Sequence, residues 1–95
     1  MSMFVAWGQI ELFIPASESL KAKRFVLKSI KTKIRNKFNV SIAEVDYLDK
    51  WQRSIFGVSA VSNDKKIAEG AIRKIIEFIE SDYRVEVTDF SIELF

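Results

Sequence analysis

The first residues of the chain alternate between apolar and polar positions. Every second residue from Phe4 to Ile14 is apolar or glycine, whereas the positions between them include Gln9 and Glu11. A period of two is typical of a β-strand with one buried face. We therefore predict a strand over residues 3–14 that ends at Pro15, with the apolar set in the core.

Two segments show the longer period of a helix. In residues 20–37 the side chains of Val26, Leu27, Ile30 and Ile34 point within about 60° of one direction at ~100° per residue, and Ser19 precedes them as a candidate N-cap. A second segment begins after the cap residues 62–64 and extends to about residue 81. Its apolar stripe is Ala68, Ala71, Ile72, Ile75 and Ile79.

Three further segments are predicted to be strands, over residues 40–47, 51–61 and 84–95. In the last of these, Val85 and Val87 are out of phase by one residue with Phe90, Ile92 and Leu94. A β-bulge near Thr88 and Asp89 brings both sets to the same face.

The order βαββαβ predicts an α+β, ferredoxin-like sandwich in which a four-stranded antiparallel sheet carries both helices on one face. Right-handed crossovers place the first and third strands at the centre of the sheet. A chain of 95 residues is the size of one domain, so we assign residues 1–95 to a single ferredoxin-like domain.

Charge is distributed very unevenly along the chain. Between Ser19 and Ala43 there are eight basic residues and no acid, whereas the other residues contain seven basic residues and thirteen acids. The net charge of +2 is therefore the difference between a basic first helix and an acidic remainder. Positive charge concentrated in this way favours contact with a polyanion.

The basic residues of the first helix follow spacings of three and four. This pattern predicts one exposed basic face, with candidate nucleic-acid-binding residues Lys21, Lys23, Arg24, Lys28, Lys31 and Arg35. Neighbouring like charges cost about 0.2 to 0.5 kcal/mol per pair, and no acid on the helix relieves them. The alternative is a solvated face that binds nothing and is balanced by acids elsewhere.

The start of the same helix combines a hydroxyl, free backbone N–H groups and cations that the helix dipole disfavours. We predict an anion site there, formed by Ser19, Lys21, Lys23 and Arg24.

The uncovered face of the predicted sheet carries aromatic and apolar residues, namely Trp7, Phe13, Trp51 and Ile55. RNA bases stack on aromatic side chains presented in this way by other sheet proteins. A bare apolar face is at least as often an interface between two copies of a chain, so we favour a homodimer.

The chain has no Cys and no His, which excludes thiolate chemistry, the usual zinc ligands and histidine-based nucleophile pairs. The acids Glu44, Asp46 and Asp49 could form a magnesium cluster or an acid pair, but acids near a strand end are more often solvated or matched to basic neighbours. We therefore predict a protein that is not an enzyme and needs no metal or cofactor. The apolar N-terminus lacks the basic start of a signal peptide and is too short to span a membrane, so we expect a cytoplasmic protein.

Several linked motifs resemble one family. They are Ser19-Leu20-Lys21-x-Lys23-Arg24, Leu27-Lys28-Ser29-Ile30, Phe38-Asn39-Val40-Ser41-Ile42-Ala43-Glu44-Val45 and Asp49-x-Trp51-Gln52. On these motifs the chain resembles the YlxP-like family of small bacterial proteins, whose function is unknown. The resemblance implies a ferredoxin-like fold. Genes of the family often neighbour those of a translation initiation factor and a ribosome-maturation factor, which implies a protein that acts near RNA or the ribosome.

The sequence therefore predicts a non-enzymatic cytoplasmic protein that binds RNA or a ribonucleoprotein surface through its first helix. The alternative is a protein-interaction or small-ligand regulatory module, homodimeric through its open sheet face, in which the basic helix is merely solvated.

Overall fold

The computed structural model describes residues 1–95 and contains six elements in the predicted order. Their bounds are β1 Phe4–Phe13, α1 Leu20–Lys37, β2 Ser41–Asp46, β3 Arg53–Ser62, α2 Lys65–Glu80 and β4 Glu86–Leu94. The ranges predicted for both helices and for β1 agree closely with these bounds. The third strand begins at Arg53 rather than Trp51, so Trp51 lies in the loop between β2 and β3.

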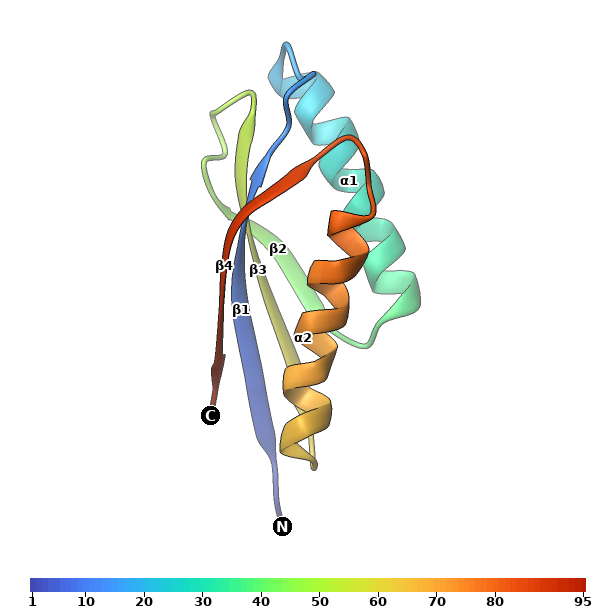
Figure 1. Ribbon diagram of the computed structural model, residues 1–95, viewed down its shortest axis with the longest axis vertical. Coiled ribbons are helices and arrows are strands. Elements are labelled where there is room, and N and C mark those ends of the chain that lie inside the picture. The colour runs from blue at the N-terminus through green and yellow to red at the C-terminus, as the bar shows by residue number, and fades with distance from the viewer.

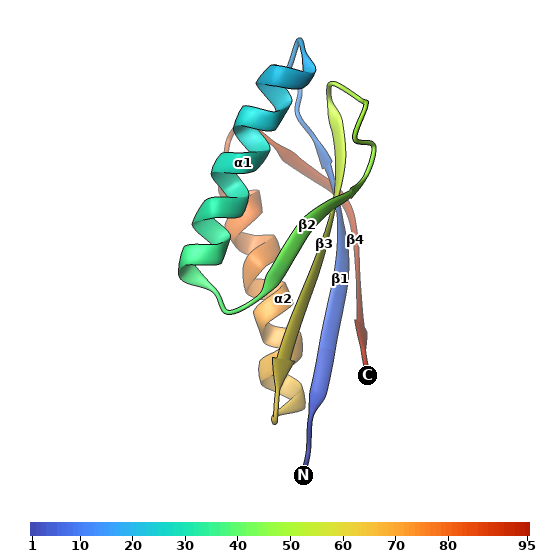
Figure 2. The ribbon, with the colours of Figure 1, turned by 180° about the vertical axis from the view of Figure 1, so that it is seen from behind.

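The strands form one antiparallel sheet in the order β2-β3-β1-β4, with β1 and β3 at its centre as predicted. Both helices cover the same face of this sheet and leave the other face bare (Figures 1 and 2). The ferredoxin-like α+β arrangement is therefore confirmed.

The core lies between the inner face of the sheet and the helices. Alternate residues of β1, among them Ala6, Ile10 and Leu12, are fully buried against isoleucines of α2. Gly8 allows α2 and β4 to approach β1 closely, because a Cβ atom at this position would lie 2.9 Å from Ile72 and from the carbonyl oxygen of Ser91. Burial of this apolar surface is the main stabilising contribution to the fold.

Two β-bulges adjust the register of the edge strands. Glu11 pairs with Asp89 but Leu12 pairs with Val87, so Thr88 is the extra residue of β4. This confirms the predicted bulge, which lets Val87 of one apolar set and Ile92 and Leu94 of the other pack against the core, while Phe90 stays exposed. A second bulge, which the sequence did not reveal, leaves Val45 of β2 unpaired.

Both helices begin at the predicted cap residues. The Ser19 hydroxyl accepts a hydrogen bond from the backbone N–H of Ala22 at 3.0 Å, and the Asp64 carboxylate accepts from the N–H groups of Lys66 and Ile67. Neither helix is long and apolar enough to cross a membrane.

Candidate nucleic-acid interface

Five cations form a stripe along the outer surface of α1, which we call the basic stripe: Lys21, Arg24, Lys28, Lys31 and Arg35. All are exposed except Lys31, which is half-buried. Arg35 is partly engaged, because its Nη2 donates a hydrogen bond to the carbonyl oxygen of Ile42 at 2.8 Å. The structure thus places the predicted stripe on one accessible surface.

No member of the basic stripe forms an ion pair. The three ion pairs of the structure join Lys23 to Glu44, Arg53 to Glu11, and Arg84 to Asp82. The acids elsewhere in the chain therefore do not neutralise the stripe by direct contact.

Lys23 is not part of this surface, and its prediction as a phosphate contact is wrong. Its side chain is fully buried and points toward the sheet. The ammonium donates to the Glu44 carboxylate at 3.0 Å and to the carbonyl oxygens of Tyr47 at 2.8 Å and Arg53 at 3.1 Å, with that of Leu48 at 3.5 Å. A phosphate cannot reach an ammonium enclosed in this way.

These contacts make Lys23 the fixed point of the β2–β3 loop, residues 47–52. The loop turns at Tyr47, whose φ of 60° is unusual for a residue other than glycine. The Glu44 carboxylate also accepts a hydrogen bond at 2.7 Å from the fully buried Ser54 hydroxyl. One helical side chain thus holds both ends of the loop and the two strands that flank it.

The predicted anion site at the start of α1 is not assembled. The Ser19 hydroxyl is occupied as the N-cap, and Lys23 turns inward. Of the four residues predicted for the site, only Lys21 and Arg24 are exposed.

The four residues predicted for a dimer interface do not form one continuous apolar face. Trp7 stacks on Phe95 with ring centroids 6.2 Å apart, six residues along β1 from Phe13. Between these two ends, Ile55 pairs with Glu11, and Glu11 forms an ion pair with Arg53. The prediction that all four residues lie together is wrong, since a charged pair interrupts the face and Trp51 belongs to the loop.

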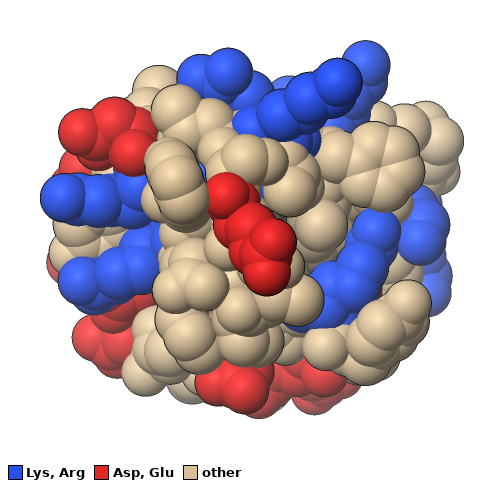
Figure 3. All heavy atoms as spheres, turned by 90° about the horizontal axis from the view of Figure 1, so that it is seen from above, with Lys and Arg blue, Asp and Glu red and all other residues tan.

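Phe13 and Trp51 do line the same hollow, which measures about 720 Å³. It lies at the end of the molecule where α1 begins and the β2–β3 loop turns, at the top of Figure 1. Its other lining residues are Ser17, Glu18, Lys50, Gln52 and Arg53. Figure 3 looks onto this end, where basic side chains lie along the upper, right and left margins, and acidic side chains lie in the centre, at the upper left and along the lower margin.

The acids near this end have separate contacts. Glu44 is held by Lys23 and Ser54, whereas Asp46 accepts a hydrogen bond from the backbone N–H of Tyr47. No group of three or more acidic side chains is arranged to hold a metal ion.

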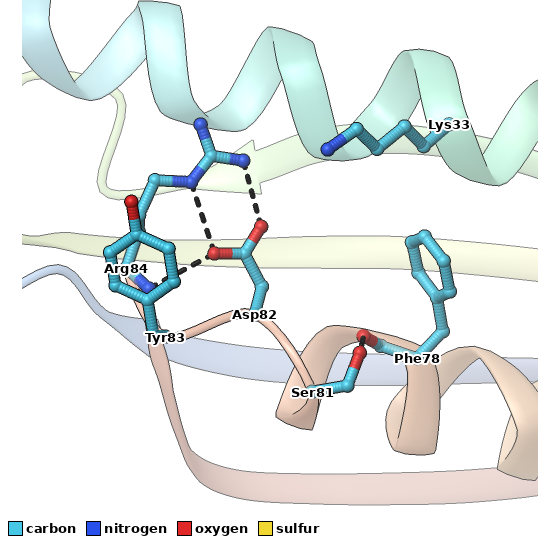
Figure 4. Close-up of a pocket in the computed structure, with 6 residues that line it drawn as sticks. All are labelled: Lys33, Phe78, Ser81, Asp82, Tyr83 and Arg84. Carbon is cyan, nitrogen blue, oxygen red and sulfur yellow. Dashed lines mark hydrogen bonds and ion pairs between the residues drawn. The ribbon is translucent and has the colours of Figure 1, made fainter.

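A second hollow, of about 490 Å³, lies between α1 and the end of α2 (Figure 4). There Asp82 accepts hydrogen bonds from the Arg84 guanidinium at 2.7 and 3.0 Å, and Arg84 also donates to Ser29 of α1 at 3.2 Å. Hydrogen bonding to Arg84 lowers the pKa of Asp82 despite partial burial. The hollow is largely polar, and its ion pair already neutralises one of its cations. The sequence patterns did not predict this pair.

The helical periodicity of the sequence already indicates that Lys23 points inward. At 100° per residue, Lys23 lies about 20° from Ile30, in the middle of the buried stripe. A lysine on the buried face of a helix requires a partner, because an unpaired buried charge is strongly destabilising. Glu44 could not be identified as that partner without the fold.

Comparison with known proteins identifies relatives but no activity. The profile of the family described as "Protein of unknown function (DUF503)" matches residues 5–92. The "Uncharacterized protein YlxP" of Bacillus subtilis (strain 168) is 43% identical over 84 residues, which are 88% of this chain and 91% of that protein. The solved structure of "De novo designed protein Foldit4" aligns with a TM-score of 0.53 at 14% identity, over 99% of this chain and 97% of that one, which shows a shared fold only. The predicted resemblance to YlxP-like proteins is confirmed.

Proposed function

The chain belongs to the DUF503 family, whose function is unknown, and we propose that this member binds RNA or a ribonucleoprotein surface through the basic stripe of α1. The observation that carries the proposal is that none of the five stripe cations has an acidic partner. The like charges of the stripe repel one another, which destabilises the helix slightly, and a bound polyanion removes this repulsion.

The stripe would contact phosphates rather than base edges. Lysine and arginine side chains spaced along one helix face match a repeating charge, and such contacts carry no sequence information. Bound counterions are released when phosphates are neutralised, so affinity falls with salt. With about four cations engaged, log affinity against log salt should have a slope of roughly −3 for a single strand.

The test is a salt titration of RNA binding by two double variants. In Lys28→Gln/Lys31→Gln the stripe loses two cations, and the slope should flatten by about 1.4 while all RNAs weaken alike. The matched control is Lys65→Gln/Lys66→Gln, which removes the same charge from exposed positions at the start of α2. This control should keep the parent slope.

Equal weakening of both variants would show that net charge, not the stripe, attracts RNA. Binding that does not depend on salt would refute the proposal.

Self-association through the sheet remains a second candidate, supported by one end of the bare face. There Phe95 is 72% and Val61 60% exposed near Trp7, whose buried indole N–H has no hydrogen-bond partner. Light scattering at about 100 μM should report a dimer, because a standard interface is largely occupied at that concentration. A monomeric mass would exclude this candidate.

A further inference from the structure

We propose that Trp51 is a stacking platform for one unpaired nucleobase, so that the RNA bound by the basic stripe is single-stranded at this end. This inference rests on the proposed function and assigns the class of RNA. The observation behind it is the position of Trp51, which the sequence pattern predicted to lie in a strand and in a dimer interface.

Trp51 lies outside the core. It is 56% exposed, does not belong to the hydrophobic cluster, and stands in a loop between Lys50 and Gln52. Trp51 is therefore not explained by core packing, whereas aromatic side chains such as its indole are the surfaces on which bases stack in single-strand binders.

The loop that carries Trp51 is held by several hydrogen bonds. Lys23 fixes the carbonyl oxygens of Tyr47 and Arg53 at its two ends. In addition, the Gln52 side chain donates to the carbonyl oxygen of Pro15 at 3.0 Å, and the backbone N–H of Ile14 donates to that of Gln52 at 2.8 Å. These four hydrogen bonds limit the motion of a short loop, and a platform that is already ordered loses less conformational entropy on binding.

The surroundings of Trp51 fit a base attached to a phosphate chain. The hollow of about 720 Å³ beside the indole is open and lies within the range of about 300 to 1,000 Å³ typical of small-ligand sites. Lys50 lines it as a cation, and Glu18 lines it as an acceptor for an exocyclic amino group. Arg53 is less free, since it forms an ion pair with Glu11 and its guanidinium lies 4.4 Å from the Tyr47 ring centroid.

The hollow adjoins the basic stripe. Ser17 and Glu18 line it and directly precede the first turn of α1, which carries Lys21 and Arg24. A strand whose phosphates follow the stripe toward the start of α1 would therefore extend toward the hollow beside Trp51. A duplex has no unpaired base to stack there.

The experiment uses the Trp7→Phe variant, in which Trp51 is the one remaining tryptophan. The probes are an octaadenylate single strand, a blunt RNA duplex of matched phosphate number and an abasic octamer. Octaadenylate should quench Trp51 fluorescence, whereas the duplex and the abasic octamer should not. Trp51→Ala in the native background should weaken octaadenylate about tenfold without changing the salt slope, and Trp51→Phe should retain most of the affinity.

Unchanged affinity of Trp51→Ala for octaadenylate, with the stripe double variant still impaired, would overturn the base site and leave the proposed function standing. Equal quenching by the duplex would also overturn it. Absence of salt-dependent binding by every probe would overturn both proposals.

Discussion

Lys23 and Lys28 lie five residues apart on the same helix and have opposite environments. The Lys23 ammonium is fully buried with an acidic partner and backbone carbonyl acceptors, whereas Lys28 is exposed and forms no ion pair. The difference follows from their positions around α1, since Lys23 shares the direction of Ile30 and Lys28 points about 160° away from it. The angular position of a basic residue on this helix therefore decides whether it forms a buried ion pair that stabilises the fold or remains an exposed charge.

The largest expected effect on stability comes from removing the buried Lys23 ammonium. Lys23→Met should lower the free energy of unfolding by about 3 to 5 kcal/mol, because it leaves the Glu44 carboxylate without its cationic partner and removes the ammonium donor from the carbonyl oxygens of Tyr47 and Arg53. Lys28→Met, the matched control on the exposed side, should change it by less than about 0.5 kcal/mol. Urea unfolding of both variants checks this. Similar stabilities would mean that the two lysines contribute alike and that the comparison fails.

Ser19 tests whether the start of α1 is a cap or an anion site. Ser19→Ala should destabilise the protein by about 1 kcal/mol, because it removes the acceptor for the N–H of Ala22. RNA affinity measured at a temperature well below unfolding should remain unchanged. A variant that kept its stability but bound RNA less tightly would restore the anion site that the fold argues against.

Removing a cation from the exposed side of α1 should raise the free energy of unfolding rather than lower it. Lys21→Gln removes a cation from the first turn, where the helix dipole disfavours it, and should raise stability by about 0.3 to 1 kcal/mol at low salt. Thermal unfolding at low and at high salt measures the gain, which screening should reduce. The same variant should bind RNA less tightly, so that stability and binding change in opposite directions.

The Asp82–Arg84 ion pair is intermediate in burial between Lys23 and Lys28. It is partly buried and contacts Ser29 of α1, away from the basic stripe. The pKa of Asp82 is lowered in the folded state by its hydrogen bonds to Arg84, so the pair stabilises the fold above the ordinary aspartate pKa of about 3.9. This stabilisation should be lost as the pH falls through the lower, folded-state pKa.

The pair is expected to contribute a few tenths of a kcal/mol to the free energy of unfolding, which is the smallest of the four stability effects predicted here. Asp82→Asn should remove that part of the pH dependence, as followed by urea unfolding between about pH 2 and 7. An unchanged pH profile would show that the pair contributes nothing measurable.

The periodicity of the chain predicted its architecture because each element buries one face. The alternation in β1, the stripes of both helices and the phase change in β4 at Thr88 each reflect which side of an element meets the core. The sequence pattern did not predict the bulge at Val45. β2 is an edge strand with few buried residues, and short, partly exposed segments show only a weak alternation of apolar and polar residues.

The candidate site could be predicted only in part. Spacing alone located the basic stripe, since helical angle decides which cations share a surface. Trp51 was misplaced because an apolar residue next to a strand extends its apparent pattern, while the strand itself begins at Arg53. The anion site was misjudged because residue type indicates which groups can bind an anion but not which are already engaged.

The sequence by itself determined the order of elements, the core faces and the uneven distribution of charge, all of which depend on residues close together in the chain. Only the tertiary structure decided what Lys23 does. Its partners Glu44, Tyr47 and Arg53 lie 21 to 30 residues away and meet it because β2 and β3 pair beneath the start of α1. A buried charge is stable only where such distant groups converge, and their convergence depends on the whole fold.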